Sequence, residues 1–303
     1  MRHGFVHFPP ETVFLRWLAI VARRSLSPSV RAAMAFLMLV NLAQGHGAYH
    51  DVVEEITQKL AVTPEDAALH FKLACAHQEH GEWKAALIEC ERVRRLDATG
   101  FDTDYIEGKA LAAGGHLEAA KGILDAFLAQ HPQHASALAE RGRVHLKLKK
   151  QVEAQNDFAA ALSLEKHAPV DWWLEAAQAG KAVEVLRKAL LAHADDPQLL
   201  NASLEAELKA GNTDEALRRV DAMQKIAPRA EPWMASRAQV LAAAGRGEEA
   251  RAAWTALRAH LLSLPNLERG TPLLAGVLAE TEKALGIAAP AVVVAPPAPA
   301  PPP

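Results

Sequence analysis

The sequence predicts an all-α fold, a right-handed α-solenoid of stacked helical hairpins, and two observations support this prediction. First, an alanine returns at intervals of 34 residues, with a single interval of 28 among them. The recurring residues are Ala86, Ala120, Ala154, Ala182, Ala216 and Ala250. Second, half of the chain is hydrophobic but only 5% is aromatic, which suits closely spaced helices. A fixed period in this range is typical of proteins whose helix-turn-helix units pack on one another.

Residues 1–45 are predicted to be a signal peptide or a long leader. A short apolar run, residues 34–43, follows the basic residues Arg23 and Arg24 and ends close to the small residue Gly45. This order is typical of a secretory signal, and the run is shorter than the roughly 20 residues that a transmembrane helix needs. We expect cleavage after Gly45, with an uncleaved anchor as the alternative.

Both versions of the N-terminus place the repeats outside the cytoplasm. The alanine- and arginine-rich composition resembles that of bacterial proteins, so the periplasm is the expected location. If the leader is not cleaved, the expectation changes to a protein anchored in the inner membrane, and only then is a membrane contact expected.

Residues 46–66 are predicted to contain an N-terminal capping helix. The amphipathic stretch from Tyr49 to Leu60 is in phase with the second helix of a hairpin, so it would cover the exposed side of the first repeat. Thr63 is then expected to be the N-cap of the next helix, with Pro64 as its first residue.

Residues 67–264 are predicted to form about six repeats. With the recurring alanine at position 20, the repeats begin near residues 67, 101, 135, 169, 197 and 231. Position 15, the turn between the two helices, is glycine in four cases out of five; its residues are Gly81, Gly115, Lys149, Gly211 and Gly245. Apolar residues at positions 24 and 27 share one side of the second helix with position 20.

A second small residue is expected to face the alanine across each hairpin. Position 8 is Ala74, Gly108 and Gly142 in the first three repeats. Two small residues let the paired helices approach closely, so that larger residues can interlock with the next repeat. A bulkier residue there would overpack the contact, at a cost of about 1–3 kcal/mol.

The fourth repeat is shortened near residues 169–182. Six residues are missing, and because Ala182 and Leu186 keep the pattern of the second helix, we expect the loss in the first helix. Trp172 and Trp173 lie in this segment. Two interpretations stay open: the rings fill the space left by the missing residues, or they form an exposed aromatic patch for a partner.

Residues 265–286 are predicted to form a C-terminal capping helix, which opens at Thr271-Pro272 and ends at Gly286. The remaining residues, 287–303, are almost entirely alanine, valine and proline, a composition that favours an extended, unpacked tail.

The repeats resemble the tetratricopeptide repeat family. Three segments carry the resemblance: HFKLACAHQEHGEWKAALIECERVRRLD (70–97), GKALAAGGHLEAAKGILDAFLAQHP (108–132) and AELKAGNTDEALRRVDAMQKIAP (206–228). About two thirds of the chain follows the pattern. The resemblance implies a non-enzymatic interaction scaffold of the bacterial cell envelope, whose protein or peptide partner binds in the concave groove formed by the first helices.

The resemblance also implies which residues line this groove. Transferred by repeat position, they include Phe71, Gln78, Tyr105, Lys109, Arg143 and Lys147. Three of these are cations that would form a basic strip for a peptide carboxylate; the alternative is a solvated face of mixed charge. The family's carboxylate clamp is incomplete, because its asparagine is absent from the first repeat, so we do not expect binding of chaperone tails.

A metal-binding or small-ligand protein is the alternative function. If cleavage follows Gly45, His46 offers a free amine and an imidazole, and His50 lies one helical turn away, which suits copper or zinc. No ligand spacing is regular, however, so no cofactor is predicted. Cys75 and Cys90 either form one disulfide or stay free.

Catalysis and nucleic-acid binding are not predicted. The chain lacks a glycine-rich phosphate loop, a Gly-x-Ser-x-Gly motif and a His-Glu-x-x-His motif. Its net charge is −3, and acidic and basic residues are mixed without a basic block.

Overall fold

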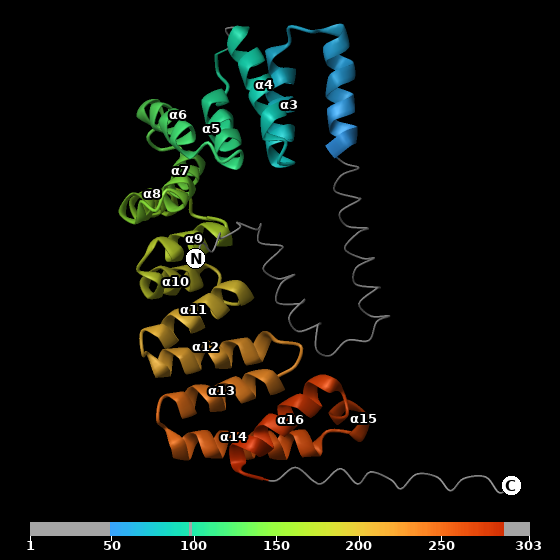
Figure 1. Ribbon diagram of the computed structural model, residues 1–303, viewed down its shortest axis with the longest axis vertical. Coiled ribbons are helices and arrows are strands. Elements are labelled where there is room, and N and C mark those ends of the chain that lie inside the picture. Colours follow the sequence, from blue (N-terminus) through green and yellow to red (C-terminus); the bar gives the residue numbers. More distant parts are fainter. Residues whose placement is uncertain (1–48, 97–98, 288–303) are drawn as a thin grey trace, which may run out of the picture. The chain divides into compact units, whose positions relative to one another are not determined.

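The computed structural model describes residues 49–96 and 99–287, and the described chain is helical, with no strand among these residues. It divides into two compact units: unit 1 ends at Ala192 and unit 2 begins at His193 (Figure 1). The predicted leader, His46 and all but the first residue of the predicted tail lie outside the described residues.

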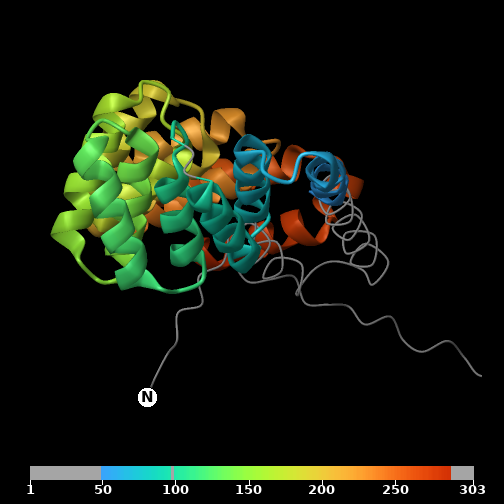
Figure 2. The same cartoon turned by 90° about the horizontal axis from the view of Figure 1, so that it is seen from above.

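Unit 1 is a stack of helical hairpins preceded by a single helix over residues 49–62. Each helix packs against the next, and the first helices of neighbouring hairpins also contact one another, so they form a continuous row (Figure 2). The hairpins are α3 (Ala67–Glu79) with α4 (Trp83–Arg95), α5 (Thr103–Ala113) with α6 (Leu117–Gln130), α7 (Ala135–Lys147) with α8 (Gln151–Leu164), and α9 (Val170–Ala179) with α10 (Ala182–Ala192).

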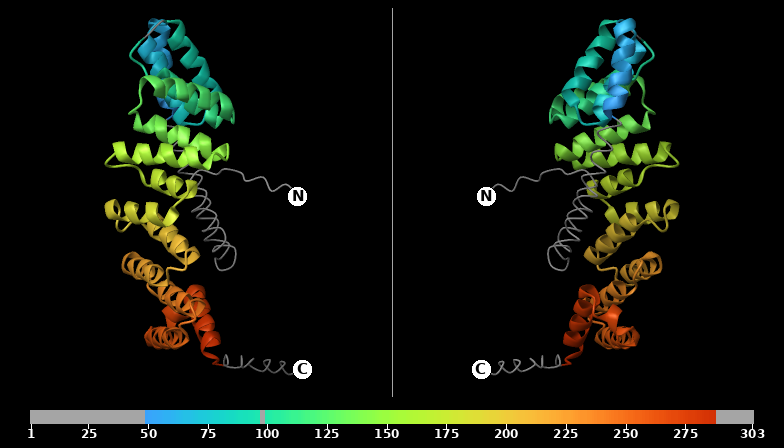
Figure 3. Two further views of the ribbon diagram at one scale, coloured as in Figure 1. Left: turned by 90° about the vertical axis from the view of Figure 1, so that its left-hand side faces the viewer. Right: turned by 90° about the vertical axis from the view of Figure 1, so that its right-hand side faces the viewer.

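Unit 2 contains two hairpins and a C-terminal cap. The hairpins are α11 (Pro197–Lys209) with α12 (Thr213–Ile226), and α13 (Glu231–Ala243) with α14 (Gly247–Ser263) (Figure 3). After the short α15 (Asn266–Arg269), α16 (Pro272–Leu285) packs against both α13 and α14, which is the predicted capping role. It ends at Gly286, whose φ of 71° is left-handed, as expected for a helix C-terminus.

The small residues at positions 8 and 20 have the predicted packing role. The alanines at position 20 in the first three hairpins are fully buried. At position 8, a Cβ atom on Gly108 would lie 2.7 Å from Cγ of Leu124, and one on Gly142 would lie 3.0 Å from the ring of Phe158. The paired helices therefore approach so closely that a side chain at residue 108 would force Leu124 to shift, and one at residue 142 would be tight against Phe158.

The predicted turn position is confirmed by the backbone. All five residues at position 15 have positive φ, which ranges from 62° at Lys149 to 86° at Gly81. Lysine at this position adopts the conformation that glycine adopts in the other hairpins. Because a side chain disfavours left-handed backbone, Lys149 is a strained turn residue.

The prediction for the start of α3 is wrong. The helix begins at Ala67, and its N-cap is Asp66, whose carboxylate accepts a hydrogen bond from the Leu69 amide at 3.1 Å. Thr63 belongs instead to the end of the preceding helix, because its hydroxyl donates to the Lys59 carbonyl at 3.1 Å. Pro64 lies in the turn between the two helices.

The shortened hairpin also differs from the prediction, since its second helix is not intact. In the other hairpins the second helix begins three residues before the position-20 alanine, whereas α10 begins at Ala182 itself. In α9, Ala176 keeps position 8 and is buried. The six missing residues therefore come from the tip of the hairpin: the end of α9, the regular turn and the first turn of α10.

A two-residue turn closes this shortened tip. Gly180 and Lys181 have φ values of 147° and 50°, and they connect α9 directly to α10. Gln155 of α8 donates its side-chain amide to the Ala179 carbonyl at 2.7 Å, which satisfies a carbonyl that would otherwise lack a partner at the end of α9. A tertiary contact thus takes over part of the role of the missing residues.

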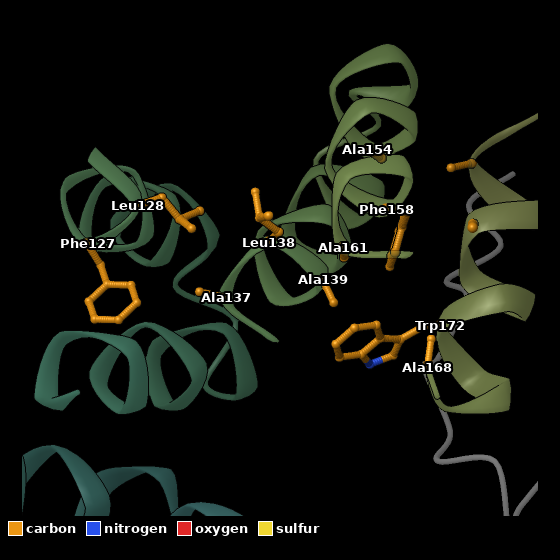
Figure 4. Close-up of a cluster of buried hydrophobic side chains, with 12 residues drawn as sticks. Phe127, Leu128, Ala137, Leu138, Ala139, Ala154, Phe158, Ala161, Ala168 and Trp172 are labelled. Atoms are coloured by element: carbon orange, nitrogen blue, oxygen red, sulfur yellow. The ribbon is translucent and has the colours of Figure 1, made fainter. Parts of the chain in front are cut away.

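Trp172 belongs to the hydrophobic core of unit 1. It occupies position 4 of its repeat, and only 7% of the residue is exposed. Its indole points from α9 toward Ala139 of α7, within a cluster that also contains Phe158 and Ala161 (Figure 4). For Trp172, the interpretation as an exposed aromatic patch is therefore wrong, because the alanines of α7 and α8 leave room for the ring.

Candidate functional site

The row of first helices in unit 1 presents the side chains that the sequence assigned to a groove. We call this surface the first-helix face. It consists of Phe71, Cys75, Gln78 and Glu79 of α3; Tyr105, Lys109 and Ala112 of α5; Arg143, Leu146 and Lys147 of α7; and Asp171 and Glu175 of α9. Contacts between α3 and α5, α5 and α7, and α7 and α9 make the face continuous.

Two half-buried aromatic residues lie on this face. The ring centroid of Phe71 is 5.0 Å from that of Phe101, and Tyr105 packs 6.1 Å from Phe127 and 4.9 Å from His134. Burial, with a smaller contribution from the Glu140 charge, raises the pKa of Tyr105 to about 12. Its hydroxyl therefore stays neutral and can donate a hydrogen bond at physiological pH.

Lys109 and Lys147 are held in place without a carboxylate partner. The ammonium of Lys109 lies 5.4 Å from the centroid of the Tyr105 ring, which is within the range of a cation–π interaction. Lys147 donates to the Ala112 carbonyl of α5 at 3.4 Å. Among the described residues neither ammonium makes an ion pair, so both positive charges remain open to a partner.

Arg143 is different, because three carboxylates surround it. Its Nε lies 2.9 Å from both oxygens of Glu175, one Nη lies 3.0 Å from Glu140, and the other lies 3.2 Å from Asp171. The predicted basic strip is therefore reduced to Lys109 and Lys147, since the Arg143 charge is used within the protein. The neighbourhood of Arg143 carries an excess of negative charge.

The remaining predicted residues are partly enclosed. The carbonyl oxygen of the Gln78 side chain and the indole nitrogen of Trp173 are buried and have no hydrogen-bond partner among the described residues. Trp173 is half-buried and borders a cavity of about 360 Å³ between α8 and α10. The expected aromatic patch is thus limited to part of one ring.

The histidines near the N-terminus pack around an aromatic residue. Tyr49 stacks on His80 with ring centroids 3.8 Å apart, and its hydroxyl lies 2.8 Å from Nδ1 of His77. The ring centroid of His50 is 5.3 Å from that of Tyr49. No group of three metal-ligating side chains occurs within residues 49–96 and 99–287, and His46 lies outside them.

The two cysteines are free thiols in the same hairpin. Cys90 is buried, and its burial raises its pKa to about 12, while burial also raises the pKa of Cys75. Both thiols therefore stay protonated at physiological pH and are poor nucleophiles.

Polar contacts of buried side chains lie away from the first-helix face and join the two helices of a hairpin. His70 of α3 lies 2.7 Å from Glu89 of α4, and Asp157 of α8 accepts two hydrogen bonds from Arg141 of α7, at 2.9 and 2.6 Å. These pairs connect helices internally, so we assign them a structural role.

The sequence pattern did not single out Asp171 and Glu175 as members of the face, nor Glu140 as a partner of Arg143. The repeat positions of Asp171 and Glu175 could have identified them. These two residues occupy positions 3 and 7 of the fourth repeat, on the first helix that lies next to the first helix carrying Arg143. The deletion hid this relation, because the first helix of that repeat was expected to be disrupted. In the part of the chain that the structure describes, no helix is sufficiently long and apolar to cross a membrane.

Comparison with known proteins gives structural matches only. No protein-family model matches the sequence, and the search of curated proteins also found no match. The structure resembles that of Naa15/Naa10 bound to HypK, with a TM-score of 0.50 and 19% identity over 73% of this chain; the match spans 34% of that chain. A tetratricopeptide repeat protein from Parabacteroides merdae matches 82% of this chain and 99% of its own, with 15% identity and a TM-score of 0.46.

A third solved structure is YrrB, described as a tetratricopeptide repeat protein with an unusual peptide-binding site. It shares 19% identity over 55% of this chain and 87% of its own, with a TM-score of 0.42. At these identities the comparisons concern the fold alone. The helical hairpins, their period of 34 residues and the small residues at positions 8 and 20 show that this chain has the tetratricopeptide-type fold.

Proposed function

We propose that this chain is a non-enzymatic scaffold that binds an extended segment of a partner protein along the first-helix face of unit 1. One observation supports the proposal most directly: a continuous row of helices presents two half-buried aromatic rings beside two ammonium groups that have no ion-pair partner among the described residues. Such groups supply apolar contact and charge to a bound peptide.

The chemistry of the face fits binding better than catalysis. Burial raises the pKa of Cys75 on this face and that of Cys90 on α4, so neither thiol is a ready nucleophile. The one arginine of the face is held by carboxylates. Aromatic rings and cations at fixed positions, by contrast, are common contact residues in protein interfaces.

We further propose that the scaffold works in the bacterial cell envelope, in the periplasm or anchored at the inner membrane. The basic, apolar and small residues in sequence within residues 1–45 support export. N-terminal sequencing of the protein from fractionated cells tests this part: a mature chain starting at His46 in the periplasm is expected. An intact N-terminus in the cytoplasmic fraction would contradict export.

Selection from a displayed library of random 12-residue peptides tests the binding function. We expect peptides that bind the chain, and we expect the double variant Lys109→Glu/Lys147→Glu to weaken their binding about tenfold or more, a loss of about 1.4 kcal/mol or more. Lys84→Glu is the matched control, because Lys84 lies on a second helix and contacts Trp83. Peptides that bind both variants equally would place the binding site elsewhere.

A further inference from the structure

We infer that the partner segment carries two opposite charges in separate places: an acidic group over Lys109 and Lys147, and a basic group beside Asp171 at the other end of the face. This inference rests on the proposed function, because it specifies the chemistry of the segment that the first-helix face would bind.

Helix α7 separates the two charged regions. Lys147 and Arg143 are four residues apart, so they lie on the same side of α7. Their side chains extend in opposite directions: Lys147 reaches the Ala112 carbonyl of α5, and Arg143 reaches Asp171 and Glu175 of α9. The positive region therefore lies over α5 and α7, and the negative region lies over α7 and α9.

The negative region has more charge than Arg143 can balance. Three carboxylates lie within 3.2 Å of its guanidinium, which leaves an excess of two negative charges when all are ionised. Burial is the largest influence on Glu175, and together with repulsion from Asp171 and Glu140 it raises the pKa of Glu175 despite the neighbouring Arg143. A second cation at this place would be stabilised.

Asp171 is the carboxylate that a partner can reach. Its side chain is 49% exposed, compared with 22% for Glu175 and 10% for Glu140. A lysine or arginine of the partner could therefore pair with Asp171 without displacing Arg143 from the two buried carboxylates. Such a contact is an exposed or half-exposed ion pair, so it contributes more to selectivity than to affinity.

The positive region carries two ammonium groups, and contacts within the protein hold both in place. The Tyr105 ring holds Lys109 from one side, while Lys147 is exposed. Glu79 is the acidic residue of α3 on this face. Burial is the main cause of the raised pKa of Cys75, and the Glu79 charge adds to this shift while the Lys109 charge opposes it, so both charges act near Cys75. Two ammonium groups against one exposed carboxylate leave a net positive charge, which suits a partner's carboxylate.

The spacing of the two regions sets the spacing of the partner's charges. The first helices α5, α7 and α9 contact one another in order. Packed helices lie about 8–10 Å apart, so Lys109 on α5 and Asp171 on α9, which mark the outer ends of the two regions, are separated by roughly 16–20 Å. At about 3.3 Å per residue, an extended segment spans this distance in about five or six residues.

The experiment uses the full chain and a displayed library of random 12-residue peptides. For the wild-type chain we expect the selected peptides to share an acidic and a basic residue about five or six residues apart. For Lys109→Glu/Lys147→Glu we expect the acidic preference to become basic while the other charge is kept. For Asp171→Lys, or the milder Asp171→Asn, only the basic preference should be lost or reversed.

Defined peptides then test the pairing directly. A peptide in which only the acidic residue is changed to lysine should bind Lys109→Glu/Lys147→Glu at least tenfold more tightly than it binds wild type. A second peptide has the same composition, but its acidic and basic residues are adjacent. It should bind wild type at least tenfold more weakly than the peptide in which these residues are five or six positions apart. The controls are Lys84→Glu and Glu153→Lys, on the second helices α4 and α8, together with circular dichroism of every variant.

The outcomes separate this inference from the proposed function. Peptides that require the first-helix face but show no spaced pair of charges would overturn the inference and leave the scaffold function intact. An unchanged peptide preference in both charge variants would also overturn the inference. If those peptides bind Lys109→Glu/Lys147→Glu as tightly as wild type, the binding site lies elsewhere and the proposed use of the first-helix face fails as well. If no peptide binds the folded chain at all, both proposals fail.

Discussion

Gly108 illustrates how little space separates the two helices of a hairpin. A Cβ atom there would lie 2.7 Å from Cγ and 2.8 Å from Cδ2 of Leu124, a residue with no exposed surface. The whole side chain of Leu124 would have to move, because the steric clash involves Cγ, the atom at which the side chain branches. Gly122, also helical, offers the opposite situation, since no atom lies within 4 Å of its added Cβ.

The two glycines therefore predict opposite results for the same substitution. Gly108→Ala should lower the free energy of unfolding by about 1–3 kcal/mol through overpacking. Gly122→Ala should raise it by up to about 1 kcal/mol, because alanine favours helix more than glycine does. Urea denaturation followed by circular dichroism measures both, and equal effects at the two positions would contradict the packing described for Gly108.

Lys149 supports a second prediction. Its φ of 62° is the conformation that glycine adopts in the corresponding turns of the other regular hairpins. Lys149→Gly should therefore stabilise the protein by about 1 kcal/mol, the cost of left-handed backbone for a residue with a side chain. Lys149→Ala serves as the control for loss of the charge and should give no comparable gain; a glycine variant that is no more stable than the alanine variant would contradict the strain.

Helix 49–62 shows how a single element depends on a few aromatic and polar contacts. Ile56 is the residue of this helix that is buried, and Tyr49 contacts His77 of α3 and His80, the C-cap of α3. Burial lowers the pKa of His77, although the charges of Glu89 and Glu82 oppose the shift and His80 adds to it. The folded protein therefore favours neutral His77 more than the unfolded chain does.

The docking of helix 49–62 should consequently weaken in acid. The stabilisation that comes from neutral His77 is complete above its ordinary pKa of 6.5 and is lost as the pH falls toward the lowered value. Hydrogen exchange of residues 49–62, corrected for the intrinsic rate, should show less protection at pH 5 than at pH 7. His77→Asn should remove this difference, whereas His50→Asn, at an exposed position, should keep it.

The hairpins also show which elements a sequence predicts and which it does not. Four turns and the C-terminal cap follow from local signals, namely glycine at position 15, proline at the first helical position and Gly286 at the end. The fourth hairpin follows from a tertiary contact, because Gln155 satisfies the Ala179 carbonyl from 24 residues away. No local pattern could show that the deletion falls at the tip.

For the candidate site, too, the sequence predicts some features and not others. The repeat positions assign Lys109 and Lys147 to one face, because position follows from the period. They could not show that Arg143 is held by Glu140, Asp171 and Glu175, since this depends on how α7 and α9 pack. The burial of Trp172 likewise depends on the alanines that face it.

At the scale of the whole molecule, each unit has its own hydrophobic core. In unit 2, Leu204, Ala216 and Val220 belong to one cluster, and Leu257 and Leu274 belong to another. In repeat proteins, stability comes mainly from each repeat and its nearest neighbours. Unit 2, with two hairpins and a cap, therefore has the parts that an independently folding unit needs.

We predict that a fragment of residues 193–287 folds on its own. Its far-ultraviolet circular dichroism should be helical, and its thermal unfolding should be cooperative and reversible. The matched control is a fragment of residues 193–264, which lacks α15 and α16 and so exposes Leu257 and Leu261; it should unfold at a lower temperature. A helical signal without a cooperative transition in the longer fragment would contradict the assignment of an independent core.

The closing of the shortened hairpin has a consequence for the history of this chain. Any side chain at residue 180 would overlap the side-chain amide of Gln155. This amide donates a hydrogen bond to the carbonyl of Ala179, the residue before Gly180. The glycine and the glutamine are therefore linked, because a side chain at residue 180 would push the amide of Gln155 away from the Ala179 carbonyl. We expect relatives that share the shortened tip to keep both Gly180 and Gln155.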